Sequence, residues 1–135
     1  MTIELSNLVY DVRMELSAMP DDMLETEQIH KEIKKANLYI NYLIDPDWED
    51  EDVQSQAIVS LAAYYSYVNY MSLISLQRDD ISSYVYQRER VLRQIALTFM
   101  KQLSKFPLSE DLSIDDKLFE KMGTLGLVNT SNIWS

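Results

Sequence analysis

The stretch Ala57–Leu76, AIVSLAAYYSYVNYMSLISL, contains no charged side chain, and its interpretation decides the fold. The uncharged run around it extends from Val53 to Gln77. About 20 consecutive residues of mainly apolar character are enough to cross a bilayer as a helix. The run is therefore either a membrane span or the buried central helix of a globular domain.

The polar residues inside the run favour the buried helix. Membrane helices place tyrosine at the two interfaces, whereas here Tyr64, Tyr65, Tyr67 and Tyr70 lie near the middle of the run. The residues before it, Glu49–Asp52, are all acidic, and no cluster of Lys or Arg flanks the run to set a topology. We therefore expect a helix that is apolar on most of its faces and enclosed by other helices, and no membrane partner.

Apolar residues recur at helical spacing in three further segments. The first covers about Leu5–Leu16 and ends before Pro20. The second ends at Asp45–Pro46, and its apolar face consists of Ile29, Ile33, Ala36, Ile40 and Leu43. The last covers about Ser83–Lys105, and we expect its inward residues to be Val91, Leu92, Ile95, Phe99 and Leu103.

These patterns predict an all-α protein with a four-helix bundle-like domain and an extended C-terminal tail. The bundle domain is expected over residues 1–106. Residues 107–135 form the C-terminal extension, with a possible short helix at Ile114–Met122.

The charge of the chain excludes one class of function. The net charge is −10, and residues 1–60 contain 14 acidic and four basic side chains, whereas residues 61–135 contain eight of each. Such a protein repels nucleic acid, which argues against a protein that grips duplex DNA by neutralising its phosphates. The chain has no cysteine, so disulfides, thiolate catalysis and cysteine-ligated metals are excluded.

The acidic segment DPDWEDEDVQSQ, Asp45–Gln56, matches a calcium-binding EF-hand loop only in part. Acidic residues stand at positions 1, 3 and 5 of the loop, but Asp50 replaces the required glycine and Gln56 the bidentate glutamate. We interpret the acidic residues as the start of the long helix, where they cap its first turn and complement its dipole.

Catalytic and metal-binding patterns are weak. The single histidine, His30, lies off the apolar face and has no Ser or Asp that would make it a catalytic base. Glu27–His30 supplies the Glu-x-x-His spacing of bundle metal sites once, where such a site needs it on two helices. We therefore expect no enzyme activity, no cofactor and no metal.

Two groups of side chains are candidates for contacts between subunits. The rings of Tyr64, Tyr67 and Tyr70 either belong to the core or reach a neighbouring subunit with their hydroxyls. The cluster of Arg88, Arg90 and Arg93 is either a solvated helix face or a patch that pairs with the acidic N-terminal half of an adjacent copy. Unlike surfaces on one chain suit head-to-tail contacts, which can close into a ring.

The C-terminal tail is too apolar to be explained as solvated coil. It either folds back on the bundle or docks on another protein, by strand addition or by placing alternate side chains in pockets. The residues that we expect to bind are Leu125, Leu127, Val128, Asn129, Ile133 and Trp134.

The segment DEDVQSQAIVSLAAYYSYVNYMSL, with a helix pair before it and a helix and a tail after it, resembles the head–tail connector proteins of tailed bacteriophages. These are also called adaptor or head-completion proteins. Their third helix has an acidic or prolyl start, an Ala-Ile-Leu-rich run, and an aromatic pair with Asn that is often followed by Arg-Glu. The matching residues are Ala57-Ile58, Leu61-Ala62-Ala63, Tyr64-Tyr65 and Asn69, whereas Tyr70-Met71 stands where the family has a basic residue. The resemblance covers roughly residues 5–76.

The resemblance implies a structural virion protein, present in the host cytoplasm during assembly and then in the neck of the virion. It implies a homo-oligomeric ring, dodecameric by resemblance, that joins the portal protein to the tail or to the stopper proteins of the neck. The tail residues would then bind the portal, and DNA would pass through the lumen without specific binding. The alternative is a small cytosolic helical regulatory or protein-interaction module.

Overall fold

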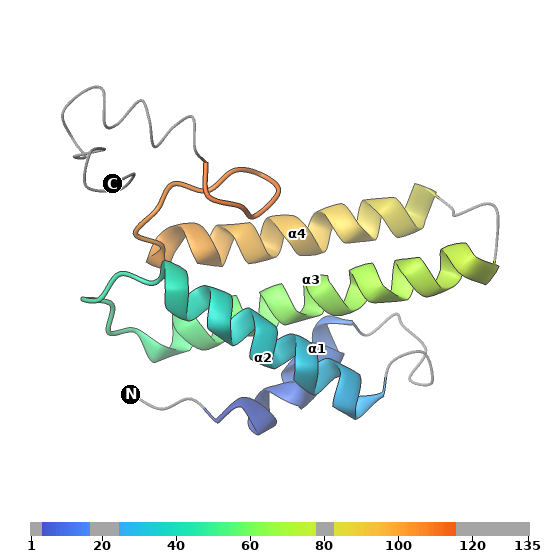
Figure 1. Ribbon diagram of the computed structural model, residues 1–135, viewed down its shortest axis with the longest axis horizontal. Coiled ribbons are helices and arrows are strands. Elements are labelled where there is room, and N and C mark those ends of the chain that lie inside the picture. Colours follow the sequence, from blue (N-terminus) through green and yellow to red (C-terminus); the bar gives the residue numbers. More distant parts are fainter. Residues whose placement is uncertain (1–3, 17–24, 78–82, 116–135) are drawn as a thin grey trace, which may run out of the picture.

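The computed structural model of the 135-residue chain describes residues 4–16, 25–77 and 83–115 (Figure 1). These residues form a short 3-10 helix, η1, followed by four α-helices that pack together. Their bounds are η1 Leu5–Leu8, α1 Val9–Glu15, α2 Thr26–Leu43, α3 Glu51–Gln77 and α4 Ser83–Leu103. The expected all-α class is confirmed.

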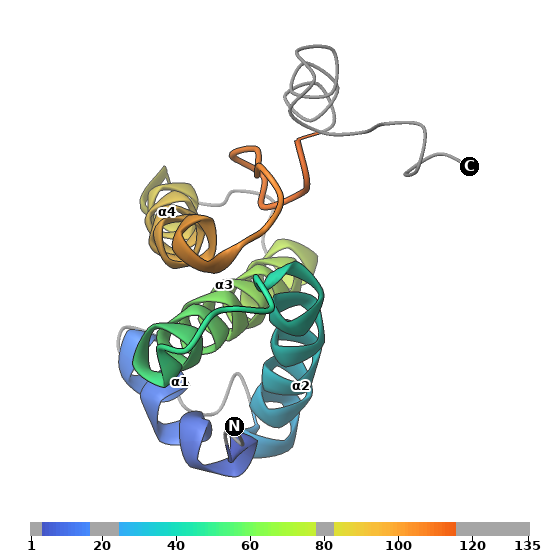
Figure 2. The same cartoon turned by 90° about the vertical axis from the view of Figure 1, so that its left-hand side faces the viewer.

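The uncharged run forms the central helix, α3. Figure 2 shows α3 between α4 on one side and α1 and α2 on the other. Ala57, Ile58, Leu61, Ala62 and Ala63 expose none of their surface, as expected of a helix enclosed by its neighbours. Within the described part of the chain, none of the helices combines the length and the apolar composition of a membrane span.

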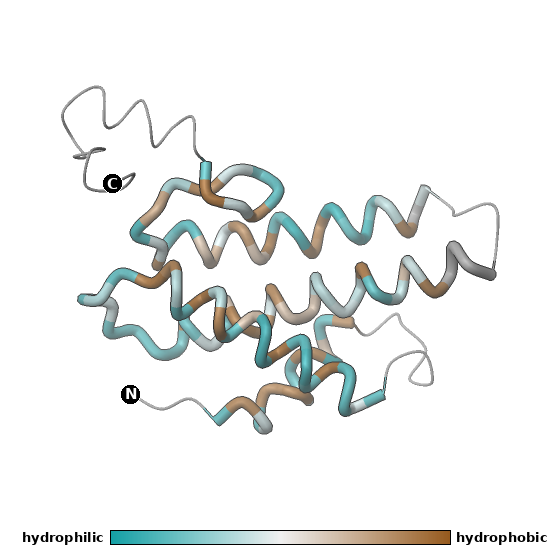
Figure 3. The backbone as a smooth tube through the Cα atoms, in the orientation of Figure 1, coloured by the Kyte–Doolittle hydropathy of each residue, from teal (hydrophilic) through white to brown (hydrophobic). Residues whose placement is uncertain are grey.

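Helix α2 has the predicted inward face. All five predicted residues are buried, because their alternating spacing of four and three residues keeps them on one side of the helix. Residues of α2 that lie off this face, such as Lys31 and Lys34, are exposed. Figure 3 shows the resulting alternation of hydrophobic and hydrophilic residues along α2 and α4.

Helix α4 packs inward through only part of the predicted face. Leu92 and Leu103 are buried as expected, and Phe99 packs against the core, but Val91 is 43% exposed and Ile95 is half-buried and lies outside the core cluster. The prediction for Val91 is therefore wrong. Consecutive residues of an α-helix point about 100° apart, so a helix that buries Leu92 turns Val91 away. The buried residues of α4 are Leu92, Ala96, Leu97, Met100 and Leu103.

Residues 104–115 turn back over the bundle after α4. Leu108 and Leu112 belong to the core cluster, and the Tyr39 hydroxyl donates a hydrogen bond of 2.7 Å to the Leu112 carbonyl. Leu112 adopts a left-handed backbone, φ 73°. The chain thus packs on the bundle as far as residue 115, while the predicted domain boundary at residue 106 stays a prediction. The proposed short helix at Ile114–Met122 lies almost entirely outside the described residues.

Candidate subunit interface

The tyrosines of α3 lie mainly against their own chain. Tyr67 is only 5% exposed and belongs to the core, and Tyr64 and Tyr70 are half-buried and pack against it. The rings of Tyr67 and Tyr70 have centroids 5.6 Å apart. A contact of these residues with a neighbouring subunit stays a prediction, and it concerns the surface that Tyr64 and Tyr70 leave open.

Tyr64 and Arg93 are brought together by Glu89 of α4. The Arg93 Nη1 atom lies 3.9 Å from the Glu89 Oε1 atom, and both side chains are largely covered. Burial, and then the negative charge of Glu89, raise the pKa of the Tyr64 hydroxyl above its usual value. This polar group therefore connects α3 and α4 within one chain.

Arg88 also has a partner within its own chain. Its Nη2 atom donates a hydrogen bond of 2.8 Å to the carbonyl of Glu15, the last residue of α1. The last carbonyls of a helix lack partners within the helix, and a basic side chain there also complements the helix dipole. The three arginines thus have different surroundings: Arg88 and Arg93 are half-buried, and only Arg90 is exposed.

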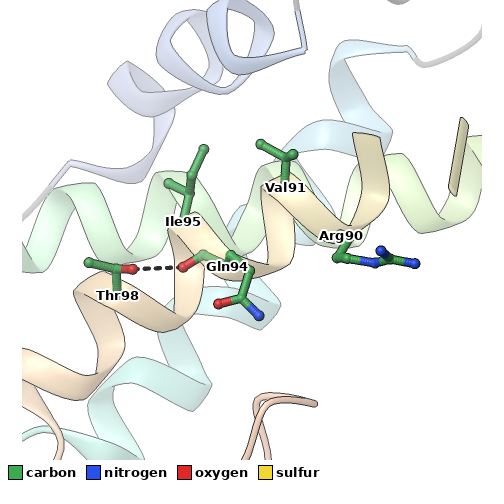
Figure 4. Close-up of a pocket in the computed structure, with 5 residues that line it drawn as sticks. All are labelled: Arg90, Val91, Gln94, Ile95 and Thr98. Carbon is green, nitrogen blue, oxygen red and sulfur yellow. Dashed lines mark hydrogen bonds between the residues drawn. The ribbon is translucent and has the colours of Figure 1, made fainter. Parts of the chain in front are cut away.

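The outer face of α4, made of Arg90, Val91, Gln94, Ile95 and Thr98, carries an open groove of about 310 Å³. Figure 4 shows Val91 and Ile95 side by side on one side of the helix and Arg90 at the end of the set. The Thr98 hydroxyl donates a hydrogen bond of 2.8 Å to the carbonyl of Gln94, so it is turned back onto the helix. The groove is therefore mainly apolar, with one exposed guanidinium beside it.

The acidic turn, Asp45–Asp52, is a second distinctive surface. All six of its acidic side chains are exposed, whereas Trp48 packs against the core. The Asp50 carboxylate accepts hydrogen bonds from the backbone N–H groups of Asp52 and Val53, at 3.1 and 3.2 Å, and so caps α3. The predicted capping role is confirmed for Asp50. Among the described residues, no group of three carboxylates or histidines is placed to hold a metal ion.

The backbone of the acidic turn is held in place at the C-terminal ends of α2 and α4. The Asp45 N–H donates to the Leu103 carbonyl, and the Lys105 N–H donates to the Leu43 carbonyl, both at 2.8 Å. The Trp48 N–H closes the turn on the Asp45 carbonyl at 2.9 Å. The turn therefore presents its carboxylates from a well-defined backbone.

A buried polar cluster between α2 and α3 was missed by sequence reasoning. Glu32 is 6% exposed, and its Oε1 atom accepts hydrogen bonds from the Asn69 and Gln28 side-chain amides at 2.9 and 3.3 Å. The Lys35 ammonium lies 4.5 Å from the centre of the Tyr65 ring, and burial raises the pKa of Tyr65 to about 12. The spacing contained a signal, since Glu32 lies three residues after the inward Ile29 and therefore on the same face.

The predicted portal-binding residues, from Leu125 to Trp134, lie outside the described residues. His30 is half-buried on α2. The geometry thus leaves two candidate surfaces for a partner, the outer face of α4 and the acidic turn.

Comparison with known proteins adds no relative. No protein-family model, no curated protein and no solved structure matches the chain.

Proposed function

We propose that this chain is a structural virion protein of a tailed bacteriophage, an adaptor whose copies form a ring between the portal and the tail. The ring would form part of the DNA exit channel. The proposal begins from the pattern of α3, whose residues Ala57-Ile58, Tyr64-Tyr65 and Asn69 stand in the places of the connector family's third helix. Two surfaces of the folded bundle, the outer face of α4 and the acidic turn, give further support.

The observation that carries the proposal is the outer face of α4. Helix α4 packs mainly against α3 and has only a narrow contact with α2, so a broad face of it remains open. This face is unlike that of a solvated helix, because Val91 is 43% exposed and Ile95 lies beside it in the groove. An apolar strip with a cationic rim, on a helix whose opposite side is fully packed, suits a contact with another protein chain.

The surface charge supports a conduit rather than a DNA-gripping protein. The six acidic side chains of the acidic turn are all exposed, and the chain as a whole has a charge of −10. A lumen lined by such subunits would repel phosphates and let DNA slide through without being held. In the proposed channel, DNA therefore passes through the lumen without binding to a specific site on the protein.

The C-terminal tail is the proposed portal-binding element. Its starting point is well defined, because Asp115 donates its backbone N–H to the Pro107 carbonyl at 2.8 Å and Leu112 is buried in the core. A tail that leaves the bundle from a fixed point can reach the portal from the same place in every subunit. The apolar residues from Leu125 to Trp134 would make the contact.

The test is electron microscopy of the purified chain mixed with purified portal rings, for the full chain and for a variant that ends at residue 123. We expect the full chain to decorate the portal as a ring. The truncated chain should keep its helical circular dichroism and lose portal binding. Its control is the full-length double variant Glu25→Ala and Lys31→Ala, which removes one exposed charge just before α2 and one on α2 and should bind normally.

Two outcomes would contradict the proposal. If the truncated chain decorates the portal as well as the full chain, the tail is not the attachment element. If the full chain is a stable monomer or dimer that does not bind portal rings, the proposed adaptor function is rejected. The alternative, a cytosolic interaction module, is then favoured.

A further inference from the structure

The apolar strip on the outer face of α4 lacks a partner among the described residues of its own chain. Val91 and Ile95 lie outside the core cluster, and the elements that pack on α4 do so from the side of Leu92 and Met100. Arg90 is exposed at one end of the strip. The groove therefore fits a small apolar group that is accompanied by negative charge.

The positive charge of α4 narrows the choice of partner. Residues 83–103 contain four basic side chains and one acidic one, Glu89, and that one is engaged with Arg93 and Tyr64. An incoming surface with carboxylates would meet Arg90 without facing an acidic side chain on the exposed strip. Exposed ion pairs of this kind contribute little to affinity, but they select the partner and its orientation.

The acidic turn has this chemistry. Pro46 is exposed between Asp45 and Asp47, so an apolar ring is flanked by two carboxylates. The Asp45 Oδ1 atom accepts a hydrogen bond of 2.9 Å from the Asp47 N–H, which shapes the tip of the turn. Since the turn is already ordered by its own hydrogen bonds, docking would cost little conformational entropy.

The two surfaces are too far apart to meet within one chain. The acidic turn is hydrogen-bonded to Leu103 at the C-terminal end of α4. Arg90 lies 13 residues earlier in the same helix, which is about 20 Å along its axis. In Figure 1 the segment joining α2 to α3 lies at the left-hand end of the long axis, whereas α4 begins near the right-hand end. The turn can therefore reach the groove only of another copy.

We infer that the acidic turn of one copy docks on the outer face of α4 of a second copy, with Pro46 against Val91 and Ile95 and with the flanking carboxylates facing Arg90. The contact joins unlike surfaces, so the first copy keeps a free groove and the second copy keeps a free turn. Repetition leads to a closed ring or to an open filament. The inference deepens the proposed function, because it names the seam of the proposed ring, and it rests on that function only for ring closure.

Disulfide trapping tests the contact without interference, because the chain has no cysteine of its own. We would introduce Asp47→Cys and Gln94→Cys in separate chains, both at exposed positions, and oxidise them mildly at high protein concentration. A disulfide needs Cα atoms within about 7 Å of each other. We expect a covalent dimer when the two variants are mixed and little from either variant alone. The double variant should form a ladder of covalent oligomers.

The matched control places the cysteine at an exposed acidic position outside the turn. Glu25→Cys mixed with Gln94→Cys should give at least about tenfold less dimer than the Asp47→Cys mixture, because the proposed contact brings only the acidic turn close to Gln94. Random collisions would instead trap both acidic positions equally. Dimers formed by Gln94→Cys alone at the rate of the mixture would mean a symmetric contact of two α4 helices and overturn the inference. Equal yields with Glu25→Cys, or no disulfide in any mixture, would overturn it as well.

A charge exchange supplies an independent readout. Arg90→Glu should weaken self-association by about tenfold or more, because like charges would then face each other. Combining Asp47→Arg with Arg90→Glu in one chain should recover most of the loss. Lys34→Glu, at an exposed position of α2, makes the same change in net charge and should have a much smaller effect. A double variant that associates no better than Arg90→Glu would contradict the pairing.

The two proposals fail in different ways. Trapping and charge exchange use the free chain and contain no portal, whereas the adaptor function is tested by portal decoration. Disulfide trapping without portal binding rejects the adaptor and keeps the contact. Portal rings decorated by chains that cannot be trapped between Asp47→Cys and Gln94→Cys reject the contact and keep the adaptor.

Discussion

At the scale of single residues, Glu32 is a carboxylate buried at the contact between α2 and α3. A buried carboxylate is unfavourable unless hydrogen bonds and charges replace its water. The Glu32 Oε1 atom has the Asn69 and Gln28 amides, and its Oε2 atom lies 3.7 Å from the Lys35 Nζ atom. Asn69 is the partner that comes from α3, so this hydrogen bond fixes α2 at one position along α3.

Replacing Asn69 by Ala should lower the free energy of unfolding by about 1.5–3 kcal/mol, the range for a hydrogen bond to a charged group. The reason is that Glu32 stays buried while it loses its shorter hydrogen bond. Urea unfolding followed by circular dichroism measures the change. Asn41→Ala, at an exposed position of α2, is the control and should change stability by less than about 0.5 kcal/mol. Equal losses of unfolding free energy for the two variants would show that the buried hydrogen bond makes no net contribution to stability.

At the scale of elements, α4 differs from α2 in the width of its apolar surface. In α2 the inward residues form one stripe, and all five that the spacing predicted are buried. In α4 the neighbours Val91 and Leu92 are both apolar, so two sides of the helix compete for the core. Leu92 is 1% exposed and Val91 is 43% exposed, which means that the side containing Leu92 packs against the bundle.

A pair of alanine substitutions tests this orientation. Leu92→Ala should lower the free energy of unfolding by about 2–5 kcal/mol, because it leaves a cavity in the core. Val91→Ala should change it by less than about 0.5 kcal/mol, since its side chain is largely in solvent. Thermal unfolding of both variants provides the comparison. A loss for Val91→Ala as large as that for Leu92→Ala would mean that α4 packs through the other side.

At the scale of the whole molecule, the acidic turn and the exposed Arg90 lie at different places along the bundle. The acidic turn lies at one end of the long axis, and Figure 3 shows it in largely hydrophilic colours. The basic side chains of the first half of α4 lie further along that axis, with Arg90 exposed. Two copies with the same charge of −10 repel each other overall, so their orientation depends on where the unlike patches meet.

The salt dependence of self-association should reveal this local attraction. Arg90→Glu and Lys34→Glu carry the same net charge, so the ratio of their dissociation constants excludes the overall repulsion. We expect this ratio to be large at about 0.1 M salt and to approach 1 at about 1 M, where the screening length falls to about 3 Å. Sedimentation velocity gives both constants. A ratio that does not change with salt would show that Arg90 acts through packing and not through charge.

Much of the fold could be predicted from short-range patterns. The end of α2 before Asp45–Pro46, the inward face of α2 and the cap of α3 by Asp50 all follow from neighbours within a few residues. Part of the candidate site could also be predicted from the sequence, because the acidic segment and the arginine cluster that contains Arg90 stand out by their charge. The groove was not, because Val91 and Ile95 were expected to be inward.

By itself, then, the sequence determined that the chain is all-α, where its helices lie and that the uncharged run is the central one, because helix periodicity and capping are local properties. Only the tertiary structure decided which side of α4 is buried, that Arg88 binds the end of α1, and that Glu32 has a partner on α3. These choices depend on contacts between residues 37 and 73 positions apart in the chain. The packing of whole helices against one another selects such contacts, and no local pattern encodes that selection.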